Sequence, residues 1–480
     1  MTDSTILKKI IILFLFIFLL KSWTYPSYKG FALRESKGHT NDITIEIPDL
    51  KSFVTGNGIQ VFYIEDELPQ LAIIVTIGFG KLYENKNNAG ISDLLAKTLT
   101  LSGSKKYPGA SLHQTIESIG GRISIHSTWE TTIISLRVIE KHSELAFNIL
   151  VDLLEHPKLD NEHIKHARSL LLERVRRKND RPSEIAFEKA REIIFDGDTY
   201  GAICSKKSLN SITRNDLLKV WETYFRSKNI IMGISTSINY SKIRDYVKTK
   251  FNKLRRGGRR VYAVDSKKIS DSMREKSKKI YLIPKDIPQS TIVVGTIAPN
   301  ISDNRIFSLT LMNYILGGGS FNSRLMKEIR VKRGLAYVVQ SVIKFRKKTG
   351  VFLAFAQTKT ESLDLTLSLL LSNIQIMTEK QVMDDELQWA KESLRNSYIF
   401  EFDTYIDLLN KFITLNYNGL TEKYLKDYPN NITKVTNKNI VNSCRDIIGN
   451  GLVKVVVGKK EILMKKLKQY GEVILVENPN

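Results

Sequence analysis

The chain has 480 residues, of which 42% are hydrophobic and 26% are charged. These proportions are typical of globular proteins and, beyond the first residues, exclude a membrane-embedded chain. Lysine and arginine number 73 against 50 acidic residues, a net charge of +23, which fits a polyanion, an anionic membrane surface or a lysine-rich solvated surface. No helix-turn-helix, RNP or zinc-finger signature accompanies the charge, so no nucleic-acid partner is expected.

Two cysteines are present, Cys204 and Cys444. Because the sequence contains no C-x-x-C pair, a zinc site built from thiolates is excluded. The two cysteines lie far apart in the sequence, which leaves open whether they are oxidised.

Residues 1–24 have the pattern of a targeting segment. Lys8 and Lys21 bracket an apolar run at 10–20, which is too short to cross about 30 Å of hydrocarbon as a helix. The run fits the apolar region of a secretory signal, and an uncleaved N-terminal anchor is the alternative. Either interpretation predicts export, with a bacterial periplasm as the expected location, in soluble or anchored form.

The next part of the chain alternates predicted strands and helices. Short apolar runs indicate strands at 59–64 and 71–77, the second apolar enough to be a buried central strand. Two segments after the turn at Gly120 indicate paired strands, at 122–127 and 131–138. Periodic segments predict helices at 89–101, 110–119, 143–154, 161–177 and 183–195, with Asp160 as the N-cap residue of the fourth.

The chain repeats itself after about 220 residues. Pro69-Gln70 precedes one apolar strand and Pro288-Gln289 precedes another, and the strand at 230–234 returns at 452–457. The repeat predicts an α+β fold of two homologous domains, each a mainly antiparallel sheet with helices packed on one face. The predicted domains are 45–252 and 279–470, with the charged, glycine-containing segment 253–278 as an exposed linker.

The segment Ala89-Gly90-Ile91-Ser92-Asp93-Leu94-Leu95-Ala96-Lys97, together with the tract from Leu101 to Pro108, resembles the first helix of the pitrilysin and mitochondrial processing peptidase family. In that family this helix carries an inverted zinc motif, H-x-x-E-H. The resemblance covers nearly the whole chain beyond residue 45 and implies two homologous halves that form a curved shell.

The resemblance places residues without zinc chemistry at the three motif positions. Two histidines four apart on a helix bind zinc on one side, and the glutamate between them takes a proton from the bound water. Here Asp93 and Lys97 occupy the histidine positions and Ala96 the glutamate position. An ammonium group repels a dication and Ala96 accepts no proton, so no metal and no catalytic residues are expected on this chain. Asp93 and Lys97 are instead expected to form an i, i+4 ion pair on a solvated helix face.

The family's third zinc ligand is a glutamate on a later helix, and the resemblance places Glu173 there. Arg174, Arg176 and Arg177 follow it, so Glu173 is interpreted as an ion-paired remnant of a ligand. His163 and His166 flank this region in a spacing that differs from the zinc motif, and we expect them on the surface.

The second half contains a glycine-rich loop, Gly317-Gly318-Gly319, that resembles a loop of the family. Glycines adopt positive φ and let a backbone approach a ligand closely, so these three are candidate substrate-binding residues. A helix is predicted at 323–333 and a strand at 337–344. The resemblance implies that Arg330 and Tyr337 bind the substrate backbone and reach an active site, where a guanidinium and a phenol suit a developing oxyanion.

These features lead to one functional hypothesis and two alternatives. The chain is expected to be a non-catalytic subunit of a zinc endopeptidase, with the zinc on a partner subunit that carries an intact H-x-x-E-H. It would enclose a peptide and supply Arg330 and Tyr337 to the partner's active site. The alternatives are a structural or assembly protein of the same fold, and a polyanion- or membrane-surface-binding protein.

Overall fold

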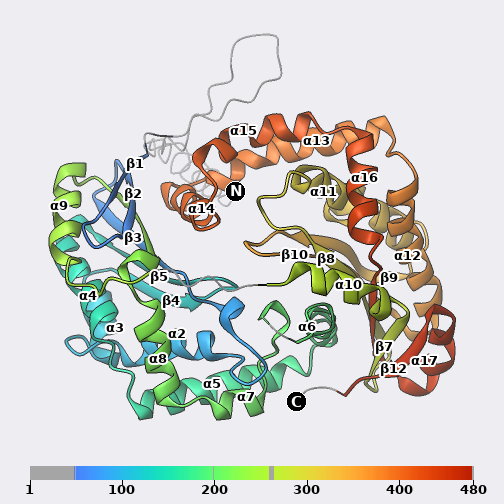
Figure 1. The fold of residues 1–480 in the computed structure, drawn as a ribbon, viewed down its shortest axis with the longest axis horizontal. Helices are drawn as coiled ribbons and strands as arrows, with labels where there is room; N and C mark the ends of the chain where they lie inside the picture. Colours follow the sequence, from blue (N-terminus) through green and yellow to red (C-terminus); the bar gives the residue numbers. More distant parts are fainter. Residues whose placement is uncertain (1–47, 49, 198, 259–263, 478–480) are drawn as a thin grey trace, which may run out of the picture.

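The computed structural model describes residues 48, 50–197, 199–258 and 264–477. The predicted signal peptide or anchor at 1–24 therefore lies outside the described residues. Figure 1 shows two halves side by side, each built on one six-stranded sheet. No described helix combines the length and the apolar character that a bilayer span requires.

The two sheets have corresponding strand orders. Sheet 1 runs β1-β2-β6-β3-β5-β4 and sheet 2 runs β12-β7-β11-β8-β10-β9. Most neighbours are antiparallel; β2 pairs parallel with β6, and β7 pairs parallel with β11 and β12. The outer strands β1 and β12 come from opposite ends of the chain, so the repeat does not include them. The strands are β1 (Lys51–Val54), β2 (Gln60–Glu65), β3 (Gln70–Ile77), β4 (Arg122–Ser127), β5 (Thr132–Ile139), β6 (Ile230–Thr236), β7 (Lys279–Pro284), β8 (Gln289–Ala298), β9 (Ala336–Lys344), β10 (Gly350–Lys359), β11 (Val453–Gly458) and β12 (Glu472–Leu475).

Helices cover one face of each sheet and bury alternate strand residues there. In the first half, Leu71, Ile73 and Val75 of β3 face the helices and are buried with them in one core. Asp160 caps α5 as predicted, since its side chain accepts a hydrogen bond from the His163 N–H. The first-half helices are α2 (Ile91–Ser102), α3 (Gly109–Ser118), α4 (Ser143–Glu155), α5 (Asn161–Lys178), α6 (Pro182–Ile194), α7 (Lys206–Ser211), α8 (Arg214–Tyr224) and α9 (Tyr240–Lys250).

The second half repeats this packing with its own core. Ile292 and Val294 of β8 are buried in one core with Leu367 and Leu370 of helix α12. The helices of this half are α10 (Ser266–Ser277), α11 (Ile306–Asn313), α12 (Leu363–Glu379), α13 (Asp384–Tyr398), α14 (Tyr405–Tyr417), α15 (Glu422–Thr433), α16 (Asn437–Ile448) and α17 (Lys460–Leu467).

The halves exchange one helix each. α14 packs on the second face of sheet 1, where Leu409 and Ile413 contact a core that contains Ile74 and Ile231. α6 packs in the same way on β8 and β11 of sheet 2. Figure 1 shows α14, orange, beside the blue strands of the first half, and α6, green, beside the second half. The second face of each sheet is therefore covered in part by a helix of the other half, and on sheet 2 α10 also packs on this face.

The segment predicted as an exposed linker is only partly exposed. Arg255, Arg256 and Gly258 are exposed, but residues 266–277 form helix α10, whose Ile269 and Met273 are buried against sheet 2. The two apolar residues are four apart and therefore lie on one helix face. This short apolar stripe within a charged sequence is the reason that the linker prediction was wrong for this part.

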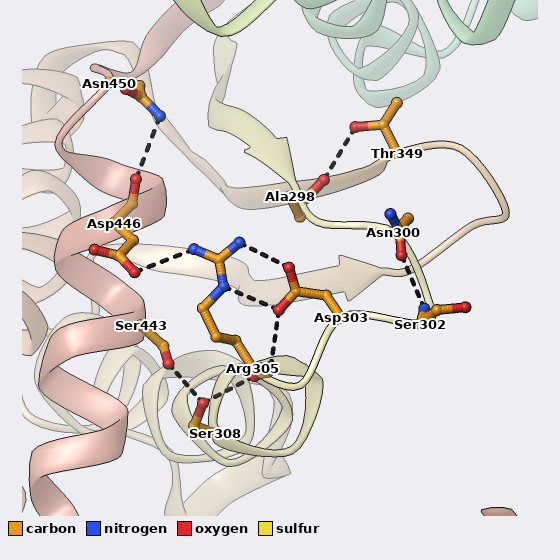
Figure 2. Close-up of polar contacts among 10 residues, drawn as sticks. All are labelled: Ala298, Asn300, Ser302, Asp303, Arg305, Ser308, Thr349, Ser443, Asp446 and Asn450. Carbon is orange, nitrogen blue, oxygen red and sulfur yellow. Dashed lines mark hydrogen bonds and ion pairs between the residues drawn. The ribbon is translucent and has the colours of Figure 1, made fainter. Parts of the chain in front are cut away.

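An arginine ties the start of α11 to α16 (Figure 2). Arg305 donates to both carboxylate oxygens of Asp303, at 2.9 and 2.8 Å, and to Asp446 at 3.1 Å. The hydroxyl groups of Ser308 and Ser443 are hydrogen-bonded to each other at 2.7 Å. These contacts fix the register of two helices that pack on the same face of sheet 2.

Candidate functional site

The first part of the candidate site is the start of α2, where the zinc motif would lie. Gly90 precedes the helix with φ of 98°, a conformation that favours glycine. The carboxylate of Glu84 accepts hydrogen bonds from the N–H groups of Gly90 and Ser92 and from the Ser92 hydroxyl. Burial raises the pKa of Glu84, although these hydrogen bonds favour its ionised form. Glu84 therefore acts as a fixed cap on this helix.

Asp93 forms its ion pairs outside its own helix. Its carboxylate lies 2.9 Å from Arg174 Nη2 on α5 and 3.4 Å from Lys81 Nζ, and its side chain is 12% exposed. The predicted pair with Lys97 and the predicted solvated face are therefore both wrong. α5 packs directly on α2 and brings Arg174 to Asp93, while Ala96 is buried.

Glu173 is ion-paired, as the sequence predicted. It accepts two hydrogen bonds from Arg176, both at 2.8 Å, and one from Arg177 at 2.7 Å. These guanidinium groups hold the pKa of Glu173 well below its ordinary value, at about 2. Its carboxylate oxygens are thus committed to neighbours on its own helix.

These residues do not fit a zinc ion. Zinc in proteins is bound by imidazole, thiolate and carboxylate groups. It usually has four ligands, one of which can be water. Within the part of the chain that the structure describes, no three His, Cys, Asp or Glu side chains are grouped to hold a metal. The one carboxylate at the motif, Asp93, is neutralised by two cationic side chains.

The glycine-rich loop is packed against its own half. A Cβ atom on Gly317 would lie 2.4 Å from the Ser341 N–H nitrogen of β9, and one on Gly319 would lie 2.6 Å from the Trp389 ring. None of Gly317, Gly318 and Gly319 has positive φ; Ser320 does, at 55°. The prediction of positive φ at these glycines is wrong, and the close approach that they permit is to β9 and α13 rather than to open space.

Arg330 lies on a π-helical segment, Met326–Val331, in place of the regular helix predicted at 323–333. A second π-helical segment, Tyr314–Gly318, precedes the glycine-rich loop. π-helical segments are rare in proteins, and those that occur are often found at functional sites. Arg330 is exposed, and its guanidinium lies 5.8 Å from the ring centre of Phe321, which is 65% exposed. No described carboxylate forms an ion pair with Arg330.

Tyr337 lies in a β-bulge at the start of β9. Val338 pairs with Gln357 and Ala336 with Thr358, so Tyr337 is the extra residue with no partner on β10. Bulges turn a side chain out of the regular alternation and are common beside active sites. Tyr337 and Val338 are both exposed as a result, and β9 is an edge strand.

Two residues of this region, Lys81 and Phe321, were not singled out from the sequence, and Arg174 was assigned to Glu173 although it pairs with Asp93. Arg174 and Lys81 reach Asp93 from other elements, and no local spacing connects them to it. Phe321 follows the glycine-rich loop directly, so an aromatic residue beside three glycines was a usable signal.

Two family models match the chain. One is described as "Insulinase (Peptidase family M16)" and matches residues 60–207; the other is described as "Peptidase M16 inactive domain" and matches residues 211–394. The chain belongs to peptidase family M16. This confirms the resemblance inferred from the sequence, for a member that lacks the zinc motif.

Curated M16 relatives include proteins with different names and roles. An "Uncharacterized zinc protease" of Rickettsia felis is 26% identical over 85% of this chain and 97% of its own length. A "Non-peptidase homolog YmxG" of Helicobacter pylori is 24% identical over 80% of this chain and 87% of its own length. The "Cytochrome b-c1 complex subunit 1, mitochondrial" of Rattus norvegicus is 21% identical over 74% of this chain and 75% of its own length.

A solved structure has the same fold. The crystal structure of a peptidase M16 inactive domain from Pseudomonas fluorescens aligns with a TM-score of 0.77 and 19% identity, over 86% of this chain and 98% of that one. The two-domain α+β architecture is therefore that of the M16 family.

Proposed function

We propose that this chain is a non-catalytic subunit of an M16 zinc endopeptidase. The observation that carries the proposal is a contrast between the halves. In the first half the zinc-ligand position is closed by the Asp93–Arg174 ion pair, whereas in the second half Arg330 and Tyr337 are exposed beside π-helical and bulged segments. The first arrangement is structural, and the second leaves polar donors free for a substrate.

In this proposal the zinc belongs to a partner subunit with an intact H-x-x-E-H. This chain helps to enclose the peptide, Arg330 donates to its backbone, and the Tyr337 hydroxyl donates to the oxyanion that forms at the scissile carbonyl. An always-charged guanidinium and a phenol stabilise negative charge without moving a proton. The apolar run at 10–20 supports export, so the pair would act outside the cytoplasm, as in a bacterial periplasm.

The test is turnover by the assembled pair. The chain is coexpressed with an M16 subunit that carries H-x-x-E-H, the complex is purified, and kcat/KM is measured on a quenched fluorescent peptide. Loss of one oxyanion donor typically costs about 100-fold or more in kcat. Arg330→Ala and Tyr337→Phe should therefore each lower the turnover of the pair by a factor of this order.

Arg333→Ala is the matched control, because Arg333 lies three residues away but is paired with Glu328. It should leave turnover unchanged, and the chain without its partner should show no turnover. If the pair with Arg330→Ala works as well as the unaltered pair, the shared active site is wrong. The relative from Rattus norvegicus, a subunit of the cytochrome b-c1 complex, supports the alternative assembly role, in which complex formation depends on neither Arg330 nor Tyr337.

A further inference from the structure

A cavity of about 830 Å³ lies on the face of sheet 1 that α14 only partly covers. α14 packs on β6, β2 and β3, and the cavity lies beyond it, over β3, β5 and β4, with Thr404 to Asp407 at its edge. Figure 1 shows α14 beside the strands of the first half. The volume is in the range of sites that hold small ligands or peptide side chains, about 300–1,000 Å³.

Two arginines line this cavity side by side. Arg122 on β4 is the direct antiparallel partner of Arg137 on β5, so both side chains leave the same face of the sheet. Cβ atoms of such partners are about 4.5–5.5 Å apart, and like charges there destabilise the sheet. Both arginines are exposed, and no described carboxylate forms an ion pair with either; Arg137 donates to Gln70 at 2.8 Å.

The acidic residues of the cavity are already hydrogen-bonded. Asp66 accepts from the Leu68 N–H, from Gln70 Nε2 and from the Ser235 hydroxyl. Asp407 accepts from the Thr404 hydroxyl at 2.6 Å. Since neither acid neutralises the arginine pair, the positive charge of the pair remains available to a ligand.

The rest of the lining contains both polar and apolar residues, and Ser124 and Ser135 are among the polar ones. Ile139, which is 46% exposed, and the half-buried Ile406 provide the apolar surface that a ligand can reach, whereas Ile74 is buried under α14. The cavity therefore offers two planar guanidinium groups at one end, which donate hydrogen bonds, and an apolar surface beside them. A guanidinium fork matches a carboxylate in geometry, and an apolar surface matches the side chain next to it.

We propose that this cavity binds a carboxylate of an extended peptide, held between Arg122 and Arg137, with a neighbouring apolar side chain on Ile139 and Ile406. The carboxylate comes from an acidic side chain or from the C-terminus. The inference rests on the proposed function and deepens it, since it names the substrate class as peptides with a negative charge. The net charge of +23 favours the approach of such peptides.

The test is direct binding to the full chain without a partner. Three eight-residue peptides carry an N-terminal fluorescein and differ in one feature: an internal Glu with an amidated C-terminus, Gln at that position with the amide, and Gln with a free C-terminal carboxylate. Fluorescence anisotropy gives Kd for each. The Glu peptide, the free-carboxylate peptide or both should bind about tenfold tighter than the neutral peptide, which corresponds to about 1.4 kcal/mol.

The double variant Arg122→Gln, Arg137→Gln should bind all three peptides with the affinity of the neutral one. Arg274→Gln, an exposed arginine on α10 outside the cavity, should retain the preference. Circular dichroism and thermal unfolding check the fold of both variants, and removal of opposed like charges should not lower the unfolding temperature. Equal binding of the three peptides, or a preference that survives in the double variant, overturns the proposal.

This assay involves neither zinc nor Arg330. If the peptides show no binding preference but turnover depends on Arg330, carboxylate binding in the cavity is wrong and the shared active site stands. If the preference is found but turnover does not depend on Arg330, only the shared active site is wrong.

Discussion

Asp93 illustrates how one residue can exchange a chemical role for a structural one. The sequence resemblance places it at a zinc-ligand position, and in the structure it accepts from Arg174 and lies near Lys81. The expectation that these positions hold no zinc rests on three residues of the sequence, because it depends on side-chain chemistry alone. The partners of Asp93 could not be predicted, because they depend on how α5 packs on α2; Arg174 lies 81 residues further along the chain.

Asp93→Asn should therefore destabilise the first half. The change removes the charge that lies between two cations, while the shape of the side chain is kept. A hydrogen bond to a charged group contributes about 1.5–3 kcal/mol, and Asp93 is only 12% exposed, so we expect a loss of about 1–2 kcal/mol in the free energy of unfolding. Urea unfolding followed by tryptophan fluorescence measures it.

Glu173→Gln is the control for that experiment. Glu173 also pairs with arginines, but its side chain is 38% exposed and both partners are about 70% exposed. Ion pairs at the surface contribute little to stability because water screens them. Glu173→Gln should therefore change stability less than Asp93→Asn; equal losses would show that the low exposure of Asp93 does not strengthen its ion pairs.

At the scale of elements, the sequence predicted regular structure better than irregular structure. The strand at 122–127 was predicted with the bounds of β4, and the five helices predicted in the first half, α2 to α6, begin within a few residues of the predicted positions. The bulge at Tyr337 and the π-helical segment at Arg330 were not predicted, because both depend on a hydrogen-bonding register that no residue pattern states. The glycines were recognised, but their neighbours, Ser341 and Trp389, come from elsewhere in the fold.

The contact between α11 and α16 makes a prediction about pH. The Arg305 guanidinium lowers the pKa of Asp303 below its ordinary value. A carboxyl group with a lowered folded-state pKa stabilises the protein above its unfolded-state value, about 3.9, and loses this contribution as the pH falls through the folded-state value. Asp303→Asn should therefore lower stability by about 1 kcal/mol at neutral pH, and the difference from the unaltered chain should shrink below about pH 4.

Urea unfolding at neutral pH and at several values between pH 5 and 3 tests this dependence. Asp446→Asn is the control on the other side of Arg305, because it accepts one bond and is 55% exposed (Figure 2). It should cost less than Asp303→Asn at neutral pH. A difference for Asp303→Asn that grows on acidification would contradict the assigned direction of the pKa shift.

At the scale of the whole molecule, the repeat predicted two similar halves but not how they are joined. The sequence contains no signal that α14 packs on sheet 1 or that α6 packs on sheet 2, since each helix has an ordinary apolar face. The hairpin loops of the two sheets also meet. The Glu130 carboxylate accepts from the Tyr200 hydroxyl at 2.5 Å and from the Lys347 N–H at 3.0 Å, and Arg346 stacks on Trp129 at 4.4 Å.

This exchange predicts that the halves stay together when the chain between them is cut. A recognition sequence for a site-specific protease is inserted between Gly257 and Gly258, where the neighbouring Arg255 and Arg256 are exposed. After cleavage the two pieces should elute together in size-exclusion chromatography at the volume of the uncut chain. The reason is that separation would expose Ile74, Leu409 and Ile413, all at most 2% exposed, and burial of each such side chain contributes about 1.5–3 kcal/mol.

The uncut insertion variant is the control for the insertion itself, and it should elute and unfold like the original chain. A further variant, Leu409→Asp, places a charge in the contact between α14 and sheet 1 and should weaken the association of the cut pieces, because a buried charge without a partner is strongly unfavourable. Pieces that separate after cleavage without this substitution would show that the chain between the halves, and not the exchanged helices, holds them together.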